Sequence, residues 1–216
     1  MKILLTGPPG AGKGSQSERL VKEFGLTSIS TGEMFREAYK NNEKLGIEAM
    51  KYINKGELVD DDITNEIVRK RLSKKDAESR FLLDGYPRTV AQAKALDQML
   101  SDMNSSLDAV IKIVVDKQVI LERMVGRRVC KQCGQTYHLS FKPPKVEGVC
   151  DKCGGTLHQR PDDQLESVLN RLEIYESKTK PLIDYYDSRG IFRSVNGDQS
   201  FDEVYASIKK ALEDVI

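Results

Sequence analysis

A glycine-rich segment near the start of the chain has the composition and spacing of a phosphate-binding loop. Residues 7–15 read Gly-Pro-Pro-Gly-Ala-Gly-Lys-Gly-Ser, an apolar run at residues 3–5 precedes them, and helix-compatible sequence continues to residue 24. Backbone N–H groups can surround a phosphate only where no side chain intrudes and positive φ is accessible. The start of a helix adds partial positive charge, and Lys13 adds a full one. The pattern therefore predicts a strand, a nucleotide-binding loop and a helix.

This loop departs from the usual pattern at one position. The residue after Lys13 is Gly14, where most loops of this type carry Ser or Thr, and the hydroxyl comes one place later, at Ser15. The spacing therefore does not by itself assign this hydroxyl its usual Mg²⁺ contact. The alternative, a glycine-rich turn without a ligand, is disfavoured by the predicted strand before it and helix after it.

The four cysteines of the chain form two Cys-x-x-Cys pairs separated by 16 residues: Cys130, Cys133, Cys150 and Cys153. This spacing is typical of a tetrathiolate metal site, and zinc is favoured over iron for a lone site of this kind. A disulfide pair and four ordinary buried cysteines are the alternatives. Both histidines, His138 and His158, fall in the same module, but four thiolates already complete a structural site.

An aspartate ends one of the predicted strands. Asp84 follows the apolar run Phe81-Leu82-Leu83, and ligands of open α/β sheets gather at such strand ends. Asp84 is therefore the best candidate for holding Mg²⁺, through bound water because Mg²⁺ gives up its water reluctantly. The alternative is that Asp84 caps the next segment.

Five arginines lie at or near predicted strand ends, loops or the borders of the cysteine module: Arg36, Arg88, Arg127, Arg160 and Arg171. A lone arginine is most often a solvated surface charge. Several guanidinium groups around a phosphate-binding loop could instead neutralise the oxygens of a transferred phosphoryl group. No residue stands out as a catalytic base, and an acceptor that is already an ionised phosphate needs none.

The remaining pattern alternates short strands with helices. Strands are predicted at residues 3–5, 26–29, 81–83, 109–115 and 190–195. Helices are predicted at 16–24, from 30, at 43–55, from 60, from 89, at about 117–128, from 165 and from 200. This order predicts an α/β fold in which helices cover both faces of a five-stranded parallel sheet.

Local signals indicate where several of these helices begin. Three pairs of residues have the spacing of a capping box: Ser30 with Glu33, Thr89 with Gln92, and Ser200 with Glu203. The acidic run at 60–62 suits the first turn of a helix. Five apolar residues predict one buried face for the helix from 165: Leu165, Val168, Leu169, Leu172 and Tyr175.

Composition excludes some classes of function. Of 216 residues 31 % are charged, yet the net charge is only +1, which gives no field for bulk binding of nucleic acid or membranes. No stretch resembles a signal peptide or approaches the ~18 apolar residues of a membrane span. We expect a soluble, cytoplasmic protein that binds neither nucleic acid nor membranes.

The motifs together resemble adenylate kinases of the bacterial type with a long zinc-bearing lid, and the resemblance covers essentially the whole chain. Six motifs in order carry it: residues 7–16, 30–36, 56–59, 84–88 with Gln92, 126–128 and 159–163. The resemblance implies the P-loop nucleoside-monophosphate kinase fold with an inserted helical segment and a zinc-ribbon-like lid. It implies reversible phosphoryl transfer, ATP + AMP = 2 ADP, with Mg²⁺ bound to ATP and structural Zn²⁺ in the lid.

The resemblance also implies roles for individual residues. Implied contacts with ATP are those of Gly10, Ala11, Gly12, Lys13, Gly14, Ser15, Arg127, Thr136, Tyr137 and Gln199, the last of which stands where some members carry Lys. Implied contacts with AMP are those of Thr31, Arg36, Glu57, Leu58, Val59, Gly85, Tyr86, Pro87, Arg88, Gln92, Arg160 and Arg171. The implied catalytic set is Lys13, Arg88, Arg127, Arg160 and Arg171.

Three parts of the chain are expected by the same resemblance. The core would consist of residues 1–29, 60–126 and 164–216. An AMP-binding domain would consist of residues 30–59, and the zinc lid of residues 127–163. The two smaller parts would close over the nucleotides and expel water that could otherwise take the phosphoryl group. We expect zinc to stiffen the lid without touching the reaction, and we expect a monomer.

Two other functions remain open at this point. Another nucleoside-monophosphate kinase would use UMP, CMP or GMP as the acceptor, although Thr31 and Gln92 favour AMP. A zinc-ribbon ATPase that binds nucleic acid would use the lysines around the cysteines, although aromatic residues are sparse there and the whole chain is near neutral.

Overall fold

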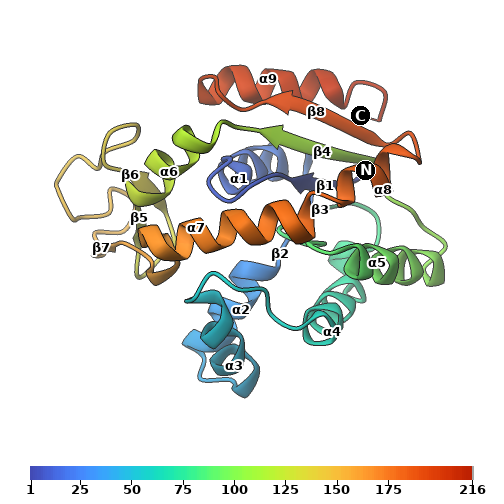
Figure 1. Ribbon diagram of the computed structural model, residues 1–216, viewed down its shortest axis with the longest axis horizontal. Coiled ribbons are helices and arrows are strands. Elements are labelled where there is room, and N and C mark those ends of the chain that lie inside the picture. Colours follow the sequence, from blue (N-terminus) through green and yellow to red (C-terminus); the bar gives the residue numbers. More distant parts are fainter. Residues whose placement is uncertain (216) are drawn as a thin grey trace.

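A five-stranded parallel sheet forms the centre of the computed structural model, which describes residues 1–215. Its strand order is β2-β3-β1-β4-β8, and every neighbouring pair is parallel (Figure 1). The strands are β1 Lys2–Thr6, β2 Thr27–Ser30, β3 Phe81–Asp84, β4 Ala109–Val114 and β8 Phe192–Asn196. The predicted fold class is confirmed, and each of these strands lies within two residues of its predicted bounds.

Helices cover both faces of this sheet (Figure 1). They are α1 Lys13–Phe24, α4 Asp61–Leu72, α5 Val90–Asp102, α6 Lys117–Val125, α7 Leu165–Ile174, α8 Leu182–Asp187 and α9 Phe201–Ala211. Side chains alternate along β1: Ile3 and Leu5 pack with α1, α6, α7 and α9, whereas Leu4 packs with α4, α5 and α8. The two faces therefore have separate apolar cores, as a parallel sheet buried on both sides requires.

Two helices form a small separate layer between β2 and α4. They are α2 Thr31–Lys40 and α3 Lys44–Ile53, and they share an apolar cluster of Phe35, Ala49 and Val59. A Cβ on Gly46 would lie 2.0 Å from the backbone nitrogen of Tyr39. Glycine at this position therefore allows the two helices to pack backbone against backbone.

The cysteine module, residues 127–163, has its own antiparallel sheet with the strand order β6-β5-β7. The strands are β5 Arg127–Cys130, β6 Thr136–His138 and β7 Leu157–His158. The module's buried cluster holds only Cys130, Tyr137 and Cys150, with Leu157 packed against it. The helix predicted to reach residue 128 was too long, because α6 ends at Val125 and the chain then enters β5.

Four predictions about helix starts have different outcomes. The capping box at Ser200 and Glu203 is confirmed, and Asp60 caps α4 with its carboxylate. The box at Ser30 is wrong, because Ser30 extends β2 opposite Asp84 and its side chain caps nothing. Thr89 accepts from the Gln92 backbone, but the Gln92 side chain bonds elsewhere, so only half of that box forms.

The apolar face predicted for the helix from residue 165 is only partly buried. Val168 is buried at 0 % exposure, but Leu165 and Leu169 are 54 % and 44 % exposed. The α-helix ends at Ile174, and a π-helical turn, Tyr175–Thr179, follows it. Tyr175 is buried at the start of that turn.

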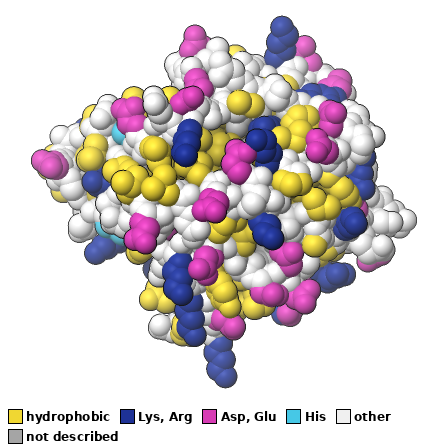
Figure 2. Space-filling model, in the orientation of Figure 1, with side chains coloured by type: hydrophobic (Ala, Val, Ile, Leu, Met, Phe, Trp, Pro, Cys, Tyr) yellow, Lys and Arg dark blue, Asp and Glu magenta, His cyan; other side chains and the backbone are white. Residues whose placement is uncertain are grey.

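The surface fits the near-neutral composition. On the face drawn in Figure 2, basic and acidic side chains are intermixed, with hydrophobic side chains between them. Within residues 1–215, no helix has the length and apolarity needed to cross a bilayer.

Candidate active site

A cleft of about 2080 Å³ runs along the edge where the parallel strands end. The loop after β1, the end of β3, the 30–59 segment and the cysteine module all contribute to its lining. Because β1 pairs with β3 in parallel, the phosphate-binding loop and Asp84 emerge side by side. This is the position at which open α/β sheets bind their ligands.

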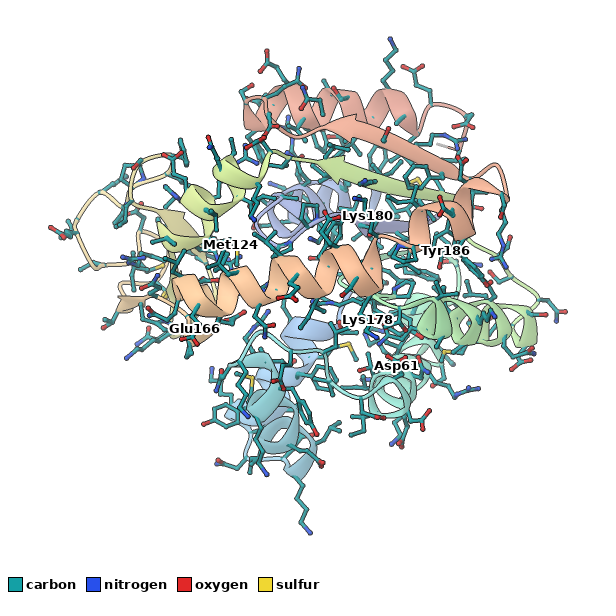
Figure 3. The ribbon with its side chains drawn as sticks, viewed as in Figure 1. Asp61, Met124, Glu166, Lys178, Lys180 and Tyr186 are labelled. Atoms are coloured by element: carbon teal, nitrogen blue, oxygen red, sulfur yellow. The ribbon has the colours of Figure 1, made fainter. Side chains whose placement is uncertain are left out.

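The loop between β1 and α1 has a backbone that only glycine permits. Gly7, Gly10 and Gly12 have φ values of 140°, 78° and 88°. A Cβ on Gly10 would lie 2.8 Å from Cγ of Met124, the α6 residue labelled in Figure 3. The helix α1 begins directly after Gly12, so the loop ends at a helix N-terminus that attracts anions.

Lys13 lies in the floor of the cleft. Its Nζ donates to the carbonyl oxygens of Gly7 at 2.7 Å and Pro8 at 2.8 Å. Burial lowers the pKa of Lys13 to about 8, with Asp84 opposing the shift and Arg88 adding to it. A phosphate would supply the negative charge that this desolvated ammonium group needs.

Asp84 lies opposite the start of α1. A Cβ on Gly14 would come within 3.8 Å of its Oδ2 atom, and Asp84 lines the cleft. The reading of Asp84 as a cap of the next helix is wrong, because Thr89 caps α5. A carboxylate beside a phosphate-binding loop suits Mg²⁺ and its bound water.

Two of the arginines are fixed by neighbouring aspartates. Arg127 forms a bidentate pair with Asp163, in which Nε lies 2.7 Å from Oδ2 and Nη2 contacts Oδ1. Nη1 of Arg171 donates to Oδ2 of Asp162 at 2.8 Å. Asp162 and Asp163 belong to the short helix η2 Pro161–Asp163, and both are buried. The Arg127 pair lies within the cysteine module, and the Arg171 pair joins the end of that module to α7.

Three other arginines line the cleft without forming an ion pair among the described residues: Arg36, Arg88 and Arg160. Burial lowers the pKa of all three, and the nearby Arg36 and Arg127 lower the pKa of Arg160 further. Guanidinium groups that repel one another in a buried site favour a polyanionic ligand between them. All five predicted arginines therefore meet in one cleft.

Several residues that are expected to contact AMP lie where β3 ends. Thr31 Oγ1 donates to the Gly85 carbonyl at 3.0 Å, and Arg88 Nε donates to the same oxygen at 2.8 Å. Tyr86 lies outside the cleft lining, fully buried, with its hydroxyl 2.7 Å from Asn65 Oδ1. The other predicted residues in the lining are Glu57, Leu58, Val59 and Gln92, whereas Pro87 is outside it.

The four cysteine Sγ atoms lie within 4.8 Å of one another. The distances are 3.5 Å between Cys130 and Cys153 and 3.6 Å between Cys133 and Cys150, too long for the ~2.05 Å of a disulfide bond. Zinc–thiolate bonds of ~2.3 Å place tetrahedral sulfur atoms about 3.8 Å apart. The cluster therefore has the composition and spacing to hold a tetrahedral metal ion.

Residues predicted to contact ATP from outside the loop have different environments. Thr136 and Gln199 line the cleft. Tyr137 is 4 % exposed, and its hydroxyl lies 3.4 Å from Cys150 Sγ and accepts from the Asp151 backbone at 2.8 Å. This hydroxyl therefore contacts the cysteine cluster, and Tyr137 also contributes to the cleft lining.

Sequence reasoning gave no role to several residues of this site. Arg123 lines the cleft and donates to the Gly197 carbonyl at 3.0 Å, and Gln16 donates to the Phe201 carbonyl at 2.9 Å. Together they tie the loop that carries Gln199 to α6 and α1. Asp162 and Asp163 belong to the 159–163 motif that carries part of the family resemblance, but the motif alone does not specify their partners.

A family model and several known proteins match nearly the whole chain, and all of them are described as adenylate kinases. The sequence pattern described as adenylate kinase matches residues 5–191. An adenylate kinase of Carboxydothermus hydrogenoformans is 57 % identical over 213 residues, which are 99 % of this chain and 100 % of that protein. The chain belongs to the adenylate kinase family. Adenylate kinases of Bacillus subtilis and a Geobacillus species are 53 % and 52 % identical, each over 98 % of both chains.

As an adenylate kinase, the protein is a phosphotransferase that interconverts ATP and AMP with two ADP. The predicted family and reaction are confirmed. The sequence offered no candidate for a catalytic base. This chemistry needs none, because the attacking AMP phosphate is already ionised. Neither the UMP, CMP or GMP kinase nor the nucleic-acid-binding ATPase is supported by these relatives.

Proposed function

We propose that the two nucleotides meet over Lys13 with their phosphates between the five arginines. The observation that carries this assignment is one cleft in which a phosphate-binding loop faces guanidinium groups from α2, β5, α7 and two loops. MgATP would occupy the side formed by Gly10–Ser15, Arg127, Thr136, Tyr137 and Gln199. AMP would occupy the side formed by Thr31, Arg36, residues 57–59, Gly85, Arg88 and Gln92.

The catalytic work in this proposal is electrostatic. Five cationic side chains neutralise the negative charge on the phosphoryl oxygens as the group passes between the two nucleotides: Lys13, Arg88, Arg127, Arg160 and Arg171. The ion pairs of Arg127 and Arg171 fix these guanidinium groups before substrate arrives, which reduces the reorganisation needed during transfer. The AMP phosphate attacks directly, so no side chain has to remove a proton.

Two metal ions fit residues of this chain. The four cysteines would hold Zn²⁺, which supplies the module with the stability that its small apolar cluster lacks. Asp84 would hold Mg²⁺ through bound water, and Mg²⁺ supplies charge neutralisation on the ATP phosphates.

Closure of the 30–59 segment and the cysteine module would exclude water from the transferred phosphoryl group. The segment lies against α7 through two hydrogen bonds, from Ser167 to the Asn54 carbonyl at 3.1 Å and from Asn170 to the Lys55 carbonyl at 2.8 Å. We further propose a monomeric cytoplasmic enzyme, as the family resemblance implies. Light scattering would report a second copy.

The direct test is an acceptor panel. Phosphoryl transfer from MgATP is measured with AMP, GMP, CMP and UMP, for the wild-type enzyme and for Arg88→Ala and Arg127→Ala. The proposal expects strong turnover with AMP, a higher KM for AMP in Arg88→Ala and a higher KM for ATP in Arg127→Ala. If both variants raise the KM of the same nucleotide, the division of the cleft is wrong.

A further inference from the structure

One carboxylate that does not line the cleft contacts a residue that does. Asp61, at the start of α4 and labelled in Figure 3, contacts two residues at the start of α5. Gln92 Nε2 donates to its Oδ1 atom at 2.6 Å, and Thr89 Oγ1 donates to its Oδ2 atom at 2.9 Å. The carboxylate therefore uses both oxygens to hold one end of a neighbouring helix.

The same contacts fix the orientation of the Gln92 side-chain amide. Its Oε1 atom accepts from the Arg88 backbone N–H at 2.7 Å, while its Nε2 atom faces Asp61. Turning the amide over would place its carbonyl oxygen against the carboxylate and its NH₂ group against an N–H donor. The two neighbours thus permit one orientation, and the charged one makes the stronger contact.

Each end of this amide keeps one unused hydrogen-bonding position. Nε2 has a second hydrogen and Oε1 has a second lone pair, and Gln92 lines the cleft although it is only 2 % exposed. An amide in this orientation offers a donor and an acceptor side by side. Adenine complements it, with N1 as acceptor and the 6-amino group as donor. Hypoxanthine presents the reverse, with a donor at N1 and an acceptor at O6.

We propose that Asp61 is a positioning residue that sets acceptor specificity by locking the Gln92 amide in the orientation that pairs with a 6-aminopurine and opposes a 6-oxopurine. The proposal rests on the contact between Gln92 and AMP proposed above. With the amide fixed, hypoxanthine would place a donor opposite a donor and an acceptor opposite an acceptor, which costs binding free energy. Discrimination between the bases therefore depends on the fixed orientation of the amide and not on its presence alone.

Asp61 is not required as a helix cap. The N-cap of α4 is Asp60, whose carboxylate accepts from the backbone of Asp62 at 2.9 Å. Asp62 shares the first turn of the helix and is exposed. Asp62→Asn therefore removes a charge from the same turn without altering the contacts of Gln92, and it serves as the matched control.

The test compares AMP with IMP, whose base is hypoxanthine, as acceptors of the phosphoryl group from MgATP. For each variant kcat/KM is measured with both nucleotides on one preparation, so their ratio does not depend on the fraction of folded enzyme. Asp61→Asn is nearly isosteric and can offer either an oxygen or an NH₂ group to Gln92. We expect the AMP/IMP ratio to fall at least tenfold in Asp61→Asn and to stay within twofold in Asp62→Asn.

Two further variants keep the outcomes distinct. Asp61→Ala removes both acceptors and should also lower the ratio, which covers the case in which Asp61→Asn is inactive. Gln92→Leu tests the underlying contact: an unchanged KM for AMP would overturn the role of Gln92. If Gln92→Leu raises this KM but both Asp61 variants lower kcat/KM equally for AMP and IMP, Asp61 is only structural and the proposal is wrong.

Discussion

The parallel sheet and the cysteine module reach order by different physical means. Each face of the sheet is covered by an apolar cluster, and most side chains of β1, β3 and β4 are fully buried. The module's buried cluster consists of two cysteines and Tyr137, while Leu139, Phe141 and Val146 are more than half exposed. Burial of apolar surface can stabilise the first region, but the second has too little of it.

The residues of the candidate active site also fall into two groups, one positioned by the sheet and one by the module. The sheet places both Lys13 and Asp84. Lys13 begins α1 after the loop that follows β1, and Asp84 ends the adjacent strand β3. Arg127 is placed by the module and by its pair with Asp163. In the function proposed above, the sheet would hold the phosphates and a separately stabilised module would supply charge over them. The module could then move without disturbing the sheet.

The largest effect is expected in the group positioned by the sheet. Lys13→Met removes the full positive charge from the phosphate-binding loop and should lower kcat by about 10³-fold or more. The free energy of unfolding should hardly change. The variant loses the two hydrogen bonds of Lys13 Nζ, but it also no longer buries a desolvated charge. Steady-state kinetics and a thermal melt measure the two quantities, and a kcat within tenfold of wild type would contradict the role of Lys13.

A core substitution and a module substitution compare the two kinds of stabilisation. Leu83→Ala opens a cavity in β3, beside Leu4 of β1, and should reduce the free energy of unfolding by about 2–5 kcal/mol. Leu139→Ala removes a side chain that is 53 % exposed and should change it by no more than about 0.5 kcal/mol. Urea denaturation measures both, and equal losses would remove the distinction between the regions.

The ion pair that holds Arg127 inside the module can be weakened separately. Asp163→Asn removes the bidentate partner of Arg127 and should cost about 1–3 kcal/mol in kcat/KM for ATP, roughly 5- to 150-fold. Glu147→Gln, an exposed change in the same module, is the control and should have no effect. An Asp163→Asn enzyme with wild-type kcat/KM would show that this pair does not position Arg127.

The smallest expected effect is a pH dependence of ATP binding. In the free enzyme the pKa of Lys13 is lowered to about 8, below its ordinary 10.5, mainly by burial. Phosphate favours the protonated amine, so binding should take up protons above pH 8 and weaken as pH rises further. Calorimetry at pH 8.5 in two buffers of different ionisation enthalpy measures this uptake, which Lys13→Met should abolish.

Local signals predicted the parts of the site that local sequence determines. The phosphate-binding loop, the two cysteine pairs and the strand-end Asp84 depend on residues close together in the chain. The contacts that orient them do not: Gln92 meets Asp61 across 31 positions, and Arg127 meets Asp163 across 36. Such pairs arise from tertiary packing, which a single sequence does not reveal.

The same limit explains the errors in secondary structure. Ser30 has the spacing of a cap with Glu33, but pairing of β2 with β3 takes precedence over the local signal. Leu165 and Leu169 extend the apolar pattern of α7, yet they lie beyond the reach of the core and remain exposed. Periodicity gave the direction of the buried face but not its extent.

The most direct test of the difference between the two regions is hydrogen exchange of the zinc-loaded protein and of the same protein after chelation. We predict that amides of residues 128–158 lose protection when the metal is removed, while amides of β1 and β4 keep theirs. Unchanged protection in the module, or a comparable loss in β1 and β4, would contradict the account that metal orders one region and apolar burial the other.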